Sequence, residues 1–123
     1  MRDYDLMRNI LITTSLSTAP LELCDFLNLA EPQEIKEELT RLKDEGLLDS
    51  TFTFDAFISH GKVQGLTKEG TCFLRNIKDE KIWMLVKKTL KAASLDISYP
   101  LLKEICEVVI KKYVMSKIPK EIE

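Results

Sequence analysis

The stretch EIKEELTRLKDEGLLDS, residues 34–50, decides the fold of this chain. At about 100° per residue, four of its side chains fall on one side of a helix, and three of them are apolar. These inward residues are Ile35, Glu38, Leu39 and Leu42. Gly46 is a typical helix stop, and Leu47-Leu48 favours a strand after it. The stretch therefore predicts a helix over residues 31–45 that turns sharply into a strand.

Further elements follow from the apolar spacing on either side of this stretch. Before it, we expect helices over 4–15 and 21–29. After it, we expect strands within 47–54 and 62–66 that flank a loop at 55–61, and then a helix capped by Thr67. A break near 76–80 and a last helix that begins after Ser98 complete the chain. The order helix, helix, helix, strand, strand, helix is that of a winged helix-turn-helix. The expected fold class is mainly α with a small β-hairpin wing (α+β), followed by two C-terminal helices.

The balance of acidic and basic side chains differs between the two expected domains. Residues 1–76, the expected winged helix-turn-helix domain, hold 8 basic and 13 acidic side chains. Residues 77–123, the expected helical extension for packing or oligomerisation, hold 10 basic and 7 acidic ones. The part that resembles a DNA reader is therefore the acidic part.

Composition excludes several classes of function. No apolar run approaches the roughly 20 residues that cross a bilayer. The charged start MRDYDLMRN is unlike a signal peptide. We therefore expect a cytoplasmic protein with no membrane partner. Cys24, Cys72 and Cys106 are widely spaced, and His60 is the single histidine, which predicts neither a disulfide framework nor a metal site. Without a phosphate-binding glycine loop or a nucleophile paired with a base, we expect no cofactor and no enzyme activity.

A DNA-binding interpretation depends on the outward side of the third helix. A helix that reads the major groove needs polar side chains aimed at base edges and cations aimed at phosphates. The candidate contacts are Gln33, Lys36, Glu37, Thr40, Arg41 and Lys43, with Lys62 from the wing. Residues 31–45 nevertheless hold six acids and three bases, a net charge of −3, and each carboxylate that faces a phosphate opposes binding.

The alternative interpretation is a module that binds a protein partner or a second copy of itself through the third helix or the C-terminal helices. The acidic outward face of the third helix is one reason for it. The apolar residues between Phe73 and Tyr113 are too many for one narrow stripe, which indicates a surface beyond the core. The candidate interface residues are Trp83, Val86, Leu90, Leu102, Val109 and Tyr113. A third possibility combines the two, because the lysines of the last two helices could form a basic patch if these helices pack antiparallel.

One segment resembles a known family. LTKEGTCFLRNIKDEKIWMLVKKTL, residues 66–90, is similar to the LTxEGxxFLxxIxxxxxWxxxKxxL signature of an uncharacterised bacterial and phage family, the domain of unknown function 2513. RDYDLMRNIL and LTRLKDEGLLDS resemble further motifs of that family in order and spacing. The resemblance implies a winged-helix-like fold with C-terminal helices in a prophage or mobile-element setting. A dimeric transcriptional regulator that binds duplex DNA and an interaction module that does not both remain open.

Overall fold

The helix predicted over the deciding stretch is α2, Pro32–Asp44, in the computed structural model, which describes residues 2–51, 53–54, 59–93 and 97–118. Its buried residues are the four predicted ones, Ile35, Glu38, Leu39 and Leu42. Pro32 occupies the first turn, where a missing N–H costs no intrahelical hydrogen bond. The inward face of α2 is thus confirmed residue by residue.

α2 ends in a Schellman motif centred on Gly46. The amide of Leu47 donates to the carbonyl of Leu42 at 2.9 Å, and the amide of Gly46 donates to that of Lys43 at 3.0 Å. Gly46 has φ of 78°, a left-handed conformation that glycine adopts without steric penalty. Leu42 and Leu47 are both fully buried, as is common for the apolar pair that accompanies this motif. The chain therefore leaves α2 in a fixed direction.

The following helix, α3 (Lys68–Ile77), is attached to this turn. The amide of Thr67 donates to the Leu47 carbonyl at 3.1 Å, and the Thr67 hydroxyl donates to the Gly46 carbonyl. The same hydroxyl caps α3 by accepting from the Gly70 amide at 2.9 Å. A Cβ on Gly70 would lie well inside the van der Waals contact distance of the Leu47 carbonyl oxygen. The Leu-Thr-Lys-Glu-Gly motif is thus a structural clamp, and Gly70 packs against Leu47 rather than against the helix α2.

A hairpin links the two sides of this clamp. β1 (Leu48–Ser50) pairs antiparallel with β4 (Val63–Leu66), and β2 (Thr53–Phe54) pairs antiparallel with β3 (Ser59–His60). The strand β3 lies where a loop over 55–61 was predicted, and residues 55–58 of that loop lie outside the described residues.

The prediction of a helix over residues 21–29 is wrong. In its place Leu21 exchanges two backbone hydrogen bonds with Val63, of 2.9 and 2.8 Å, and adds a third strand position beside β4. Only the 3₁₀ turn η1, Leu23–Phe26, is helical. The extended conformation at Leu21 is incompatible with a helix that starts there, and Leu27 near the end of the predicted helix is 44% exposed.

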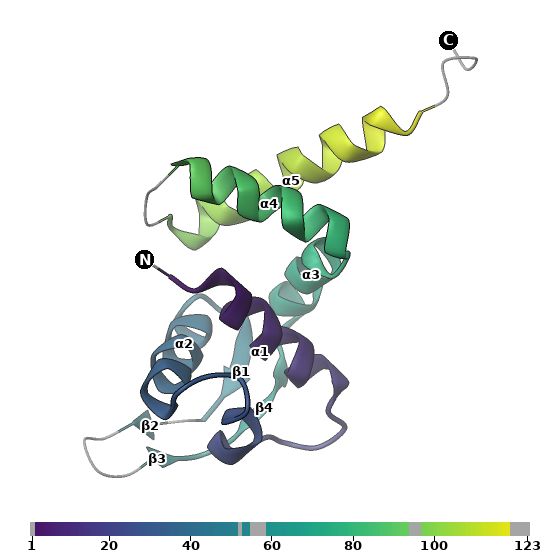
Figure 1. Ribbon diagram of the computed structural model, residues 1–123. Coiled ribbons are helices and arrows are strands. Elements are labelled where there is room, and N and C mark those ends of the chain that lie inside the picture. The colour runs from purple at the N-terminus through teal and green to yellow at the C-terminus, as the bar shows by residue number, and fades with distance from the viewer. Residues whose placement is uncertain (1, 52, 55–58, 94–96, 119–123) are drawn as a thin grey trace. The chain divides into compact units, whose positions relative to one another are not determined.

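These elements enclose one core with the first helix, α1 (Tyr4–Leu16). Figure 1 shows α1 and α2 beside β1 and β4, and α2 also packs against η1. The buried apolar residues here are Leu6, Met7, Ile10, Leu11, Phe26, Ile35, Leu39, Leu42, Leu47, Leu48, Val63, Phe73 and Leu74. They belong to one compact unit, Asp3–Leu74, which we call the N-terminal unit.

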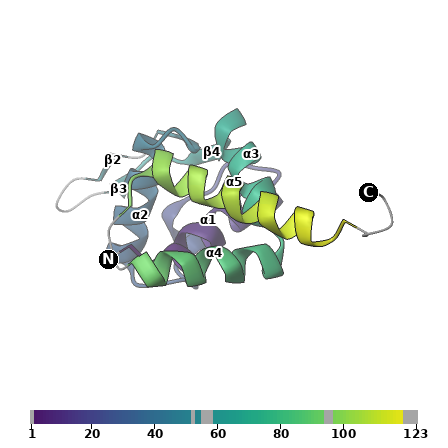
Figure 2. The same ribbon diagram turned by 90° about the horizontal axis from the view of Figure 1, so that it is seen from above.

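The C-terminal unit comprises Arg75–Glu123 with Met1–Arg2. The predicted break near 76–80 is present: α3 ends at Ile77, and α4 (Glu80–Ala93) begins with the Asp79 carboxylate, which accepts from the amides of Lys81 and Ile82. α5, Tyr99–Ser116, returns in the opposite direction and packs against α4 (Figures 1 and 2). Its last turns extend past the start of α4 (Figure 2).

The fold class is confirmed as mainly α with a small antiparallel hairpin. Within the described part of the chain, no helix has the length and apolar character that a membrane span requires.

The clamp generates a prediction for Gly70→Ala. Alanine normally favours a helix over glycine by about 1 kcal/mol. Here the added Cβ meets backbone, and overpacking of that kind costs about 1–3 kcal/mol or more. Because a backbone carbonyl cannot rotate away, we expect the cost to lie at or above the upper end of that range and the net loss of unfolding free energy to be about 2 kcal/mol or more, measured by urea denaturation. Cys72→Ala, at an exposed position of the same helix, is the control and should stay within about 0.5 kcal/mol. A stabilised Gly70→Ala protein would contradict the clamp.

Candidate interaction surfaces

The outward face of α2 consists of Gln33, Glu37, Thr40 and Asp44, all exposed as predicted. Gln33 Nε2 donates to Glu37 Oε1 at 3.1 Å, one helical turn away. The Thr40 hydroxyl donates to the Lys36 carbonyl at 2.9 Å. Both side chains proposed to read bases therefore have partners within α2. A base contact that uses the Thr40 hydroxyl proton has to replace a hydrogen bond that already exists, whereas the Gln33 amide keeps a second N–H and its Oε1 for another contact.

The cations of the predicted DNA-binding set lie close to acids. Arg41 Nε is 3.9 Å from Glu45 Oε2 on α2, and Lys62 Nζ is 3.9 Å from Glu22 Oε1. The Lys62–Glu22 pair is exposed and contributes little to stability, the Arg41–Glu45 pair is partly buried, and both lower the positive potential available to a phosphate. Lys36 is half-buried and Lys43 is exposed. The geometry therefore brings acids to the surface that a DNA backbone would contact.

The six residues predicted as an interface divide into two groups. Trp83, Val86, Leu90 and Leu102 are buried within the chain, each at most 3% exposed, and contribute to its own core. Val109 and Tyr113 on α5 are half-buried, and the Tyr113 ring lies 5.4 Å from Lys117 Nζ. A partner contact through these residues stays a prediction.

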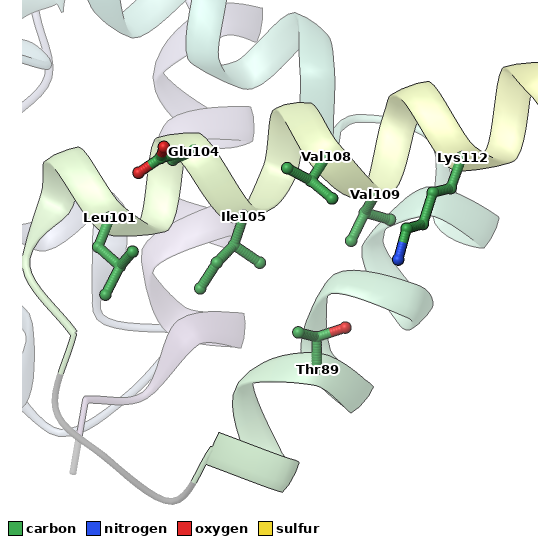
Figure 3. Close-up of a pocket in the computed structure, with 7 residues that line it drawn as sticks. All are labelled: Thr89, Leu101, Glu104, Ile105, Val108, Val109 and Lys112. Carbon is green, nitrogen blue, oxygen red and sulfur yellow. The ribbon is translucent and has the colours of Figure 1, made fainter.

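A hollow of about 480 Å³ lies between α4 and α5. Figure 3 shows Thr89 of α4 directed toward α5, with Ile105, Val109 and Lys112 of α5 on the facing side. The remaining lining residues are Leu101, Glu104 and Val108. The lining is thus mainly aliphatic, with an acid near one end and a base near the other. Such a shallow apolar surface suits a protein side chain or helix better than a charged ligand.

The hollow borders an apolar stripe on α5. Leu101, Ile105, Val108 and Met115 recur at the spacing of one helix face, and Leu101, Val108 and Met115 are 46%, 48% and 59% exposed. We call these four residues the outer stripe. Leu102 and Cys106, with half-buried Val109 and Tyr113, form the inner stripe toward α4. The sequence prediction selected inner-stripe residues and missed the outer stripe, although its three- and four-residue spacing was a usable signal.

The thiols differ in their surroundings. Cys24 and Cys72 are exposed, and Cys106 is buried on the inner stripe. Burial raises the pKa of the Cys106 thiol to about 12, and the nearby Glu107 carboxylate adds to this shift. Among the residues that the structure describes, no cluster of three or more His, Cys, Asp or Glu side chains could hold a metal ion.

We therefore expect selective alkylation of the thiols. Only the thiolate reacts, and a thiol with a pKa of about 12 is almost fully protonated at pH 8. Iodoacetamide at pH 8 should label Cys24 and Cys72 in the folded protein and Cys106 only in urea, as read by mass spectrometry of tryptic peptides. Equal labelling of all three thiols without denaturant would contradict the burial of Cys106.

Comparison with known proteins identifies the family of this chain but gives no information about these surfaces. Neither the curated proteins nor the solved structures gave a match. A family model described as "Hypothetical protein (DUF2513)" matches residues 1–96. This range covers the N-terminal unit, the Thr67–Gly70 clamp and all of α4. The chain belongs to the family of domain of unknown function 2513.

Proposed function

We propose that this chain is a non-catalytic protein-interaction module, and that its contact surface is the outer stripe of α5 with the adjoining hollow. The observation that carries this proposal is the exposure of the outer stripe. Its aliphatic side chains remain in contact with water along a helix whose other stripe already packs against α4. Exposed apolar stripes with polar borders are characteristic of surfaces that bind another protein.

The charges of α2 support this proposal over base reading. Glu34, Glu37 and Asp44 are exposed on α2, and Gln33 and Thr40 each already make a hydrogen bond within the helix. Affinity for duplex DNA comes largely from phosphate neutralisation, which this surface opposes.

DNA-associated regulation is the second candidate function. The arrangement of α2 before a hairpin, with Lys43 exposed on α2 and Lys62 on the hairpin, favours it. In that case the six predicted contacts of α2 and the wing lysine bind the duplex. The setting expected from the family resemblance, a prophage or mobile element, accommodates either function.

Site-specific photocrosslinking tests the interaction surface. A benzoylphenylalanine at Val108, on the outer stripe, is expected to give a discrete protein adduct on irradiation of cells that express the protein. The matched probe at Gln33, exposed on α2, is expected to give none. Adducts are separated by denaturing electrophoresis and their mass is measured. An adduct at Val108 with any single protein, this chain included, supports the module; its absence at Val108 overturns the proposal.

A DNA titration separates the two candidates. At low salt, we expect no saturable, sequence-dependent binding of fragments from the protein's own locus at roughly 10 μM protein, a concentration at which non-specific binding of ordinary DNA-binding proteins already appears. Fluorescence anisotropy provides the measurement. Saturable binding that is lost in Lys43→Glu, but retained in Lys88→Glu on α4, would instead establish α2 as a DNA reader.

A further inference from the structure

We infer that the partner of the outer stripe is a second copy of this chain, with the two α5 helices antiparallel and a twofold axis at Val108. This inference rests on the proposed function and names the occupant of its surface. It follows from the order of apolar and charged residues along α5.

Ile105 has Lys111 at its mirror position, whereas the other three outer-stripe residues are symmetric about Val108. Leu101 lies seven residues before it and Met115 seven residues after it, which is about 10 Å along a helix axis in each direction. An antiparallel pairing about Val108 therefore places Leu101 of one copy level with Met115 of the other. Val108 meets its own counterpart at the axis. Seven-residue spacing keeps all three side chains on nearly the same face, as helix-to-helix packing requires.

The charges are antisymmetric about the same point. Glu104 lies four residues before Val108, whereas Lys112 lies four residues after it, and both line the hollow. Lys111 precedes Lys112 and is exposed. In the antiparallel pair, Glu104 of each copy comes level with Lys111 and Lys112 of the other. The twofold axis generates this acid–base contact twice.

The reverse orientation is electrostatically unfavourable. Two α5 helices in parallel and in register place Glu104 beside its own counterpart, and they bring the two lysine pairs together in the same way. Like charges at such a contact repel, and the penalty increases as the contact excludes water. The same apolar stripe is compatible with both orientations, so the charges select the antiparallel one.

Self-complementarity is what favours a second copy over a different protein. A heterologous partner places no symmetry requirement on this surface, whereas an isologous contact needs a residue pattern that matches itself after rotation. α5 meets that requirement at Leu101, Val108 and Met115 among its apolar positions and at Glu104 and Lys112 among its charged ones. Glu104 and Lys112 both line the hollow (Figure 3), so each copy offers an acid and a base to the opposite charges of the other copy.

Charge exchange tests the pairing. Sedimentation equilibrium from micromolar to hundreds of micromolar should give a monomer–dimer equilibrium for the unmodified chain. Glu104→Lys, and separately Lys111→Glu with Lys112→Glu, should each raise the dimer dissociation constant roughly tenfold. All three changes together restore opposite charges, so the dimer dissociation constant should return to within about threefold of that of the unmodified chain. Glu107→Lys, the same change at an exposed position about a quarter turn from Val108, should shift it by at most about twofold.

A disulfide at the axis provides an independent readout. In a Cys24→Ser, Cys72→Ser background, Val108→Cys should form a covalent dimer under mild oxidation with copper phenanthroline. Two cysteines at a twofold axis can meet the short Cβ separation that a disulfide needs. Val114→Cys is the control, because Val114 is also exposed but lies on another face of α5. It should remain monomeric on a non-reducing gel.

The outcomes distinguish this inference from the proposed function. A chain that is monomeric at every concentration, or a dimer that the triple exchange fails to restore, overturns the antiparallel pair. If the photocrosslinked adduct at Val108 then contains a different protein, the interaction module stands and its partner is heterologous. A monomer without any adduct at Val108 overturns both.

Discussion

The close approach of Gly70 to the Leu47 carbonyl is the constraint on which the N-terminal unit depends. It fixes the start of α3 against the turn that ends α2, and Thr67 strengthens this junction by bonding to both sides of it. The hairpin between the two points is consequently closed at its base. Gly46 and Gly70 serve the same junction from opposite ends of the hairpin, one through a left-handed backbone and one through the space that a missing Cβ leaves.

The outer faces of α2 and α5 differ in character. α2 encloses its apolar residues in the core and presents acids, an amide and a hydroxyl to solvent. α5 packs one apolar stripe against α4 and leaves another in contact with water. A surface that already satisfies its polar groups gains little from a partner, whereas an exposed aliphatic stripe gains from every Å² that a partner covers. The difference between these faces supports the proposal that the C-terminal unit carries the contact surface.

Local pattern predicted much of the fold but little of the interaction surface. The inward residues of α2, the stop at Gly46 and the cap at Thr67 depend on near neighbours in the chain, and each was predictable. The bridge of Leu21 to Val63 joins residues 42 positions apart and leaves no periodic signal, so a helix was predicted there instead. α5 posed a different difficulty: two apolar stripes share one helix, and periodicity cannot tell which one α4 covers. The pattern therefore predicts Leu102 as an interface residue, although it is fully buried.

The separation of faces on α2 also has an evolutionary consequence. Positions 37 and 44 are exposed, and substitutions at such positions usually change stability by no more than about 0.5 kcal/mol. Lysine at both would change the net charge of residues 31–45 from −3 to +1 while every core contact stays in place. The charge of this face can therefore change sign at almost no cost in folding. A sequence with the same interior could thus present a surface of opposite charge to solvent.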